Sequence, residues 1–123
     1  MSDKKTVVIL GASNKPDRYS HKALRLLIDN GHRVIPVNPV LDDIEGLEVR
    51  HSLDEIKEEV DTVTLYMRPE RSEPLVGKIV GIKPVRVIFN PGTESEALEE
   101  RLRGEGIEAM EACTLVLLRT GRF

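Results

Sequence analysis

The chain has 123 residues, and a chain of this length is expected to form one domain, residues 1–123, with a core that is stable without disulfide bonds. Hydrophobic residues make up 40% and charged residues 32%, a balance typical of globular proteins rather than disordered chains. The net charge is -3, and two tyrosines and two phenylalanines are the only aromatic residues. The chain therefore lacks the basic groove and stacking platforms that single-stranded nucleic acid requires.

The cysteine count and the N-terminus predict the cellular compartment. The single cysteine, Cys113, excludes an internal disulfide and is typical of a reducing compartment. The first residues lack a signal-peptide pattern, and no apolar run reaches the roughly 18 residues that a membrane-spanning helix needs. We expect a cytoplasmic protein with no membrane partner.

Strand-like and helix-like segments alternate along the whole chain. In chain order they are a strand over 6–10, a helix over 20–30, strands over 33–37 and 47–50, a short helix from 52, a strand over 62–67, a helix over 70–80, a strand over 85–89, a helix over 94–103, a strand over 107–110 and an apolar run over 113–118. This alternation predicts an α/β, Rossmann-like, doubly wound fold with a mainly parallel sheet of five to six strands and helices on both faces.

One residue constrains the strand order. Numbering the strands along the chain, we expect the order 3-2-1-4-5, with the last strand at an edge. Pro36 lies inside the second strand, where a central strand needs the N–H group that proline lacks. The proline is tolerated if the third strand, residues 47–50, is short, because the missing N–H then falls beyond its end.

The helix starts differ in charge. Helix N-termini favour negative charge, and segments 52–55 and 93–96 supply it in the pattern of a capping box, with acids in the first turn. The helix beginning near Ser20 has Asp17 nearby, but its surroundings are dominated by the cations Lys15, Arg18, His21, Lys22 and Arg25. Because cations oppose the helix dipole, the pattern favours an external anion there; the alternative is a solvated basic face after a tight turn.

The turn before this helix restricts the identity of the anion. A buried strand runs directly into Gly11-Ala12-Ser13, the arrangement of a phosphate site in doubly wound domains. The dinucleotide fingerprint needs further glycines and an acid ending the second strand, but that strand ends in Val37-Asn38-Pro39. The phosphate-loop pattern is also absent. The first observation counts against NAD, and the second counts against nucleotide hydrolysis.

Several motifs together resemble a known family. The segments 11–20, 34–39, 68–69 and 90–92, with Cys113 near the end, resemble the small stand-alone CoA-binding domain proteins, which are similar to the N-terminal domain of the succinyl-CoA synthetase α subunit. The resemblance covers nearly the whole chain. It implies a Rossmann-type fold that holds CoA across the carboxyl ends of the first, second and fourth strands.

The resemblance also implies the binding residues. They are Gly11, Ala12, Ser13, Lys15, Arg18, Ser20, Asn38, Pro39, Met67, Arg68, Pro69, Asn90 and Pro91. It places Ser13 and the adjacent amides at the diphosphate, with Lys15 and Arg18 neutralising phosphates. It places segment 38–39 at the adenine or ribose, 67–69 beside the ligand, and 90–91 near the pantetheine arm. CoA carries more negative charge than NAD, which suits a site that has cations and lacks a ribose-binding acid.

The sequence offers no evident catalytic group. The succinyl-CoA synthetase α subunit, whose N-terminal domain this chain resembles, works through a phosphorylated histidine in a second domain. We therefore expect no ligase activity from the residues of this chain. The histidines His21, His32 and His51 lie in separate segments without metal-ligand spacing, so we expect no metal site. Ser13 has no histidine or acid placed by sequence to activate it, which favours a serine that donates to phosphate.

Two interpretations of Cys113 and three of the function stay open. The apolar neighbours Ala112 and Leu115 favour a buried structural thiol, and the alternative is a thiol that forms a mixed disulfide with CoA. We favour a module that binds CoA or an acyl-CoA without catalysis of its own. The alternatives are a small enzyme or regulatory subunit that uses an NAD(P)-type or other adenine nucleotide cofactor, and a structural subunit that forms a homodimer through residues 115–118.

Overall fold

A parallel five-stranded sheet forms the centre of the computed structural model, which describes residues 4–123. Its strands are β1 (Thr6–Leu10), β2 (Arg33–Val37), β5 (Thr62–Leu65), β6 (Arg86–Phe89) and β7 (Glu108–Glu111), in the order β2-β1-β5-β6-β7. All four neighbouring pairs are parallel. The α/β Rossmann-like fold is confirmed, and so is the position of the last strand at an edge.

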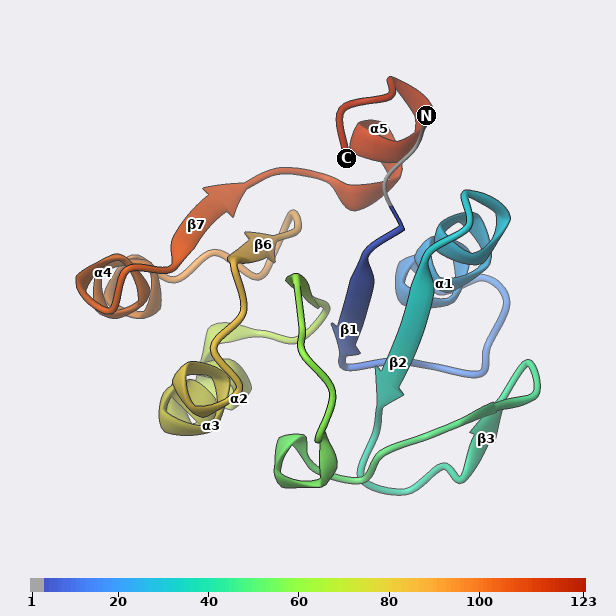
Figure 1. The fold of residues 1–123 in the computed structure, drawn as a ribbon, viewed down its shortest axis with the longest axis horizontal. Coiled ribbons are helices and arrows are strands. Elements are labelled where there is room, and N and C mark those ends of the chain that lie inside the picture. Colours follow the sequence, from blue (N-terminus) through green and yellow to red (C-terminus); the bar gives the residue numbers. More distant parts are fainter. Residues whose placement is uncertain (1–3) are drawn as a thin grey trace.

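Helices cover both faces of the sheet. One face carries α1 (Tyr19–Asp29) and α5 (Thr114–Arg119), and the other carries α2 (Pro69–Ser72), α3 (Val76–Gly81) and α4 (Glu96–Gly104), as Figure 1 shows. Side chains of β1 alternate between these layers. Val7 and Ile9 pack with the α1 side, whereas Val8 and Leu10 join the core under α3 and α4. A strand buried on both faces explains why residues 6–10 are apolar without alternation. Within residues 4–123, no helix is both long and apolar enough to cross a membrane.

The expected third strand does not join the sheet as a strand. Leu47–Glu48 (β4) instead pairs antiparallel with Asp43–Ile44 (β3), forming a small hairpin whose turn contains Gly46 at a φ of 80°. Of the expected strand 47–50, Arg50 pairs with the sheet, through an isolated parallel bridge to Val37. The expected order is therefore wrong at this edge, where β2 is the outermost strand.

Pro36 explains where this pairing occurs. Its carbonyl accepts a hydrogen bond of 2.9 Å from the Arg50 amide. The N–H and C=O of one residue in a parallel strand point to the same side, so the missing N–H of Pro36 faces the outer edge and not β1. The structure thus confirms that the proline is tolerated because the neighbouring segment pairs only briefly.

Proline also divides the helix expected over residues 70–80. The segment forms α2, a 3₁₀ turn over Glu73–Leu75, and α3. Pro74 lies in the middle of that turn, where its ring and its missing N–H interrupt the α-helical hydrogen bonds. The short helix expected from residue 52 is likewise a 3₁₀ turn, Leu53–Glu55.

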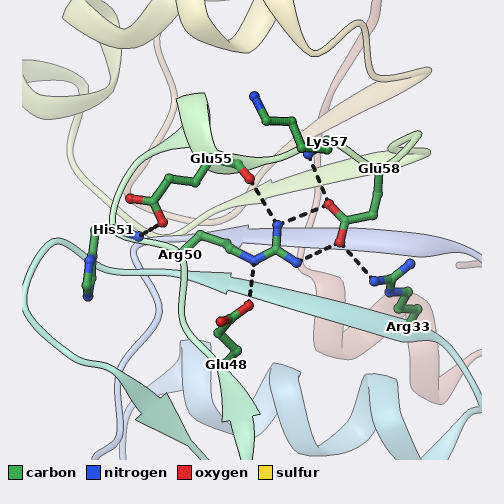
Figure 2. Close-up of polar contacts among 7 residues, drawn as sticks. All are labelled: Arg33, Glu48, Arg50, His51, Glu55, Lys57 and Glu58. Atoms are coloured by element: carbon green, nitrogen blue, oxygen red, sulfur yellow. Dashed lines mark hydrogen bonds and ion pairs between the residues drawn. The ribbon is translucent and has the colours of Figure 1, made fainter.

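An ion-pair network fastens the segment after β4 to the edge of the sheet (Figure 2). The Arg50 guanidinium donates to both carboxylate oxygens of Glu58, at 3.0 and 2.6 Å, and Arg33 at the start of β2 reaches the same carboxylate at 2.8 Å. The Arg50 and Glu58 side chains are only 17% and 19% exposed. Bidentate pairs of this geometry are among the stronger polar contacts in proteins. The network holds the crossover that carries Ser52 to the site described below.

Glu58→Gln is expected to lower the free energy of unfolding by about 1–3 kcal/mol at neutral pH, because Arg50 loses its charged partner. The hydrogen bond from Arg50 lowers the pKa of Glu58 from 4.5 to about 2. A carboxylate whose pKa is depressed by folding stabilises fully above its unfolded value and loses this contribution as the pH falls toward the folded value. The difference between wild type and variant should therefore shrink between about pH 4.5 and pH 2.

Urea titrations at about pH 7 and pH 3 measure this difference. The exposed neighbour Glu59, changed to Gln, serves as the control and should alter stability little. Equal losses for the two variants, or a difference that does not depend on pH, would contradict the role assigned to the pair.

Candidate ligand-binding site

Three connected hollows open at the carboxyl ends of the strands, the edge where doubly wound sheets bind ligands. The β2 hollow, of about 520 Å³, lies between the end of β2 and the segment 51–53. The turn hollow, of about 290 Å³, lies between the turn after β1 and the start of α1. The α5 hollow, of about 280 Å³, lies beside the start of α5. Gly11 lines the first two and Tyr66 lines all three, so the hollows adjoin one another and together make up the cleft.

Most of the predicted binding residues come together in this cleft. The β2 hollow is lined by Gly11, Ala12, Asn38, Pro39 and Met67, the turn hollow by Gly11, Ser13, Lys15, Arg18 and Ser20, and the α5 hollow by Asn90 and Pro91. Arg68 and Pro69 lie outside the walls of these three hollows. A roomier hollow of about 660 Å³ lies at the outer edge of β2, but the charged side chains Arg33, Glu45 and Arg50 in its wall are engaged in ion pairs within the chain.

The turn after β1 is held tightly against two other strands. The amides of Gly11 and Ala12 donate to the Val37 carbonyl of β2, at 3.3 and 3.1 Å. Gly11 has a φ of 96°, and a Cβ at this position would lie 2.7 Å from the carbonyl oxygen of Tyr66. This close approach of the backbone at β5 requires glycine. Ser13 then closes the turn, since its Oγ accepts from the Lys15 amide at 3.1 Å.

Helix α1 starts at this turn without a cap of its own. Its N-cap residue is Arg18. Among the described residues, no side chain accepts a capping hydrogen bond at this helix end, and the first turn has no acidic residue. The two segments expected to cap themselves do so. The Ser52 hydroxyl accepts from the Asp54 amide, and Ser95 accepts from Leu98. The cap of α4 is thus Ser95 and not the expected Thr93, whose hydroxyl donates to the Asn90 carbonyl at 2.8 Å.

The five basic residues around α1 take three positions. Lys22 lies over the Tyr19 ring, 5.3 Å from its centroid, and does not line the turn hollow. His21 and Arg25 contact the carboxylate of Glu45 on the β3–β4 hairpin, at 2.9 and 3.2 Å, and so point away from the turn. Lys15 and Arg18 are exposed and line the turn hollow. The positive charge available to a ligand at the start of α1 therefore comes from Lys15 and Arg18, not from all the cations that the sequence places nearby.

Asn38 holds the two loops that meet at the β2 hollow. Its side-chain amide donates to the Ala12 carbonyl at 2.9 Å. Its side-chain oxygen accepts from the amides of Val40 and Leu41, at 2.8 and 2.9 Å. The residue that the sequence assigns to the adenine or ribose end thus also fastens the turn after β1 to the loop after β2.

Asn90 is the centre of a buried polar network beneath the α5 hollow. It is 2% exposed. Its side-chain nitrogen donates to the Thr64 hydroxyl at 2.6 Å and to the Leu65 carbonyl at 2.8 Å, and its oxygen accepts from the Thr114 amide at 2.8 Å. The Thr64 and Thr114 hydroxyls are themselves 2.8 Å apart. These bonds join β5, β6 and the start of α5.

Sequence reasoning missed several residues that line the cleft. Tyr66 follows the carboxyl end of the central strand β5, and this position in the sequence is a signal that places it at the cleft. Burial raises the pKa of Tyr66 to about 12, so its phenol stays neutral at physiological pH. Tyr19, 68% exposed, lines the turn and α5 hollows. Arg71, one helical turn after the predicted Arg68, lines the β2 hollow.

Cys113 is placed differently from the favoured expectation. It is half-buried and lines the α5 hollow together with Leu115, so it is not a fully buried structural thiol. Of its apolar neighbours, Leu115 is buried and lines the same hollow, whereas Ala112 does not line it. For metals, residues 4–123 contain no group of three or more His, Cys, Asp or Glu side chains placed to hold an ion.

Comparison with known proteins identifies relatives of this fold. A crystal structure of an uncharacterized protein is 43% identical, with a TM-score of 0.94 over 99% of this chain and 100% of that chain. The structure of cell-free ID.343 from Thermus thermophilus is 29% identical, with a TM-score of 0.90 over 98% and 91% of the two chains. A dinucleotide-forming acetyl-coenzyme A synthetase from Ca. Korarchaeum cryptofilum shares the fold alone, at 21% identity and a TM-score of 0.73 over 85% of this chain and 25% of that chain.

A curated relative and a family model complete the comparison. Uncharacterized protein YneT from Bacillus subtilis (strain 168) is 37% identical over 67 residues, which is 54% of this chain and 50% of that protein. The match thus spans half the length of this curated relative. The model of the CoA binding domain matches residues 5–119, nearly the whole chain. This protein therefore belongs to the CoA-binding domain family.

Proposed function

We propose that this protein binds coenzyme A, free or as a thioester, in the cleft at the carboxyl ends of β1, β2, β5 and β6. One observation carries the proposal: helix α1 begins uncapped at the Gly11 turn, and Lys15 and Arg18 line the hollow in front of it. A helix N-terminus stabilises a nearby anion by about 0.3–1 kcal/mol, and a charge-assisted contact to phosphate contributes about 1.5–3 kcal/mol. The diphosphate of CoA supplies the negative charge that these groups favour.

The sequence of hollows supports an elongated ligand. The turn hollow lies between the other two, because it shares Gly11 with the β2 hollow and Tyr19 with the α5 hollow. CoA has the same order of parts: an adenine nucleotide at one end, the diphosphate in the middle and the pantetheine arm at the other end. With the diphosphate in the turn hollow, the nucleotide extends along Asn38 and Pro39, and the arm extends toward Asn90 and Pro91.

The β2 hollow disfavours NAD. Dinucleotide-binding domains end their second strand with an acid that binds the ribose hydroxyls. Here β2 ends at Val37, and none of the described residues that line the β2 hollow is acidic. Arg71 lines this hollow instead, which suits a nucleotide that carries an additional phosphate, as CoA and NADP do.

The cleft supports binding better than turnover. Ser13 lies in the turn hollow, but its Oγ accepts from the Lys15 amide and the described residues that line this hollow include no histidine or acid to activate it. His51 lines the β2 hollow and contacts Asp42 at 2.8 Å. We therefore propose a binding module rather than an enzyme.

Isothermal titration with CoA, NAD and NADP tests the proposal. We expect CoA to bind at least tenfold more tightly than either dinucleotide. Failure to bind CoA at millimolar concentration would overturn it. Tighter binding of NAD or NADP would favour the alternative, a small enzyme or regulatory subunit that uses such a cofactor.

A further inference from the structure

The α5 hollow has an uncharged and mainly apolar wall. The residues that line it are Tyr19, Tyr66, Asn90, Pro91, Cys113 and Leu115. Among these described residues there is no lysine, arginine, aspartate or glutamate. The raised pKa of Tyr66 keeps its phenol neutral as well. No charged side chain of this wall would compensate a charged group that lost its water on entering the hollow.

Asn90 is the most polar of these residues, but the protein occupies its amide. Its side-chain nitrogen donates to the Thr64 hydroxyl and to the Leu65 carbonyl. Its side-chain oxygen accepts from the Thr114 amide. The side chain therefore supports the base of the hollow and is not free to turn toward a ligand. The exposed surface of the hollow is left to aromatic rings, a proline ring, a thiol and a leucine.

The α5 hollow adjoins the turn hollow, which is the proposed anion site. Tyr19 and Tyr66 line both the α5 hollow and the turn hollow, where Lys15 and Arg18 lie. A ligand anchored by its diphosphate in the turn hollow reaches the α5 hollow with its uncharged end. The hollow measures about 280 Å³, the volume of about nine water-sized groups at about 30 Å³ each.

We propose that the α5 hollow receives the acyl group of an acyl-CoA, and that the ligand class is a short, uncharged, aliphatic acyl thioester. This inference rests on the proposed function, since it assumes that CoA occupies the cleft. An apolar wall strengthens binding with each methylene group that leaves water, by about fourfold, which corresponds to about 0.8 kcal/mol. It discriminates against an acyl group that ends in a carboxylate, because that charge would be desolvated without a partner.

A series of thioesters tests the inference by isothermal titration. The protein is titrated with CoA, acetyl-CoA, propionyl-CoA, butyryl-CoA and succinyl-CoA, with a phosphine reductant present so that Cys113 cannot form a mixed disulfide. We expect affinity to rise about tenfold or more from acetyl-CoA to butyryl-CoA. Succinyl-CoA, which has the same number of acyl carbons as butyryl-CoA but a terminal carboxylate, should bind at least tenfold more weakly than butyryl-CoA.

Cys113→Leu provides a second readout, because it fills the hollow from its wall. The loss of affinity should grow with acyl length and reach about tenfold for butyryl-CoA. Val116→Leu is the matched control, since Val116 lies on the same helix, is 52% exposed and is not part of the wall. This control should keep the preference of the wild type for butyryl-CoA. If Cys113→Leu does not fold, the thioester series with wild-type protein still decides.

The outcomes separate the two proposals. Equal affinity for all thioesters, or tighter binding of free CoA than of any thioester, would overturn the acyl hollow and leave CoA binding intact. Preference for succinyl-CoA over butyryl-CoA would also overturn it. Failure of every CoA compound to bind would overturn the proposed function itself.

Discussion

Replacing both Lys15 and Arg18 with alanine is expected to weaken CoA binding about 100-fold and to leave the stability of the protein nearly unchanged. Two charge-assisted contacts to phosphate at about 1.5 kcal/mol each give about 3 kcal/mol, which corresponds to about 100-fold in the dissociation constant. Both side chains are exposed, so their removal should alter the free energy of unfolding by no more than about 0.5 kcal/mol. Isothermal titration measures the first effect and urea unfolding the second.

A matched control removes the same charge elsewhere. Lys57 and Arg122 are exposed and lie toward the opposite end of the sheet: Lys57 adjoins Glu58, which contacts Arg33 at the start of β2, and Arg122 adjoins Phe123 beside Arg86. Changing Lys57 and Arg122 to alanine should weaken CoA binding by less than about threefold, through long-range charge alone. Equal losses in the two double variants would show that overall charge, and not contact at the turn, governs binding.

Asn90→Leu is expected to lower the free energy of unfolding by about 3 kcal/mol or more. The substitution nearly preserves the volume but leaves the Leu65 carbonyl and the Thr114 amide without this partner, while the Thr64 hydroxyl keeps its contact with the Thr114 hydroxyl. Each buried polar group left unsatisfied costs about 1–3 kcal/mol. Urea unfolding followed by circular dichroism measures the change.

Thr93→Val is the control for this substitution. Thr93 is also buried, but within the described residues its hydroxyl makes a single hydrogen bond, to the Asn90 backbone carbonyl. Its loss should cost about 1 kcal/mol. If Asn90→Leu were as stable as this control, the network would not be holding the start of α5, and the sequence-based role of Asn90 as a contact for the pantetheine arm would gain weight.

Local chemistry predicted most of the secondary structure, and its errors have specific causes. The apolar run 6–10 indicated a strand buried on both faces, and β1 is such a strand. The helix expected over 70–80 is divided because Pro74 interrupts it. The proline is present in the sequence, but the apolar periodicity of its neighbours still predicted one continuous helix. The strand expected over 47–50 pairs with its own hairpin, because partner choice depends on turn geometry and not on the apolar pattern alone.

The residues of the candidate site also divide into those whose position the local sequence predicts and those whose position it does not predict. The turn residues Gly11 and Ser13 and the cations Lys15 and Arg18 follow one another in the sequence, and a parallel sheet places everything that follows its strands at one edge. Their gathering could therefore be predicted. Glu45, which engages His21 and Arg25, lies about twenty residues away on a hairpin that the sequence did not predict. No local signal distinguishes a cation with such a partner from one without.

The sequence by itself determined the fold class, the strand–turn–helix of the proposed anion site, and the absence of the dinucleotide fingerprint, because these depend on residues that are close together along the chain. Only the tertiary structure decided which cations face the cleft, that the amides of Asn38 and Asn90 are bonded within the protein, and that Tyr66 joins three hollows into one cleft. These properties depend on contacts between segments distant in sequence, and such contacts are settled by the packing of the whole core.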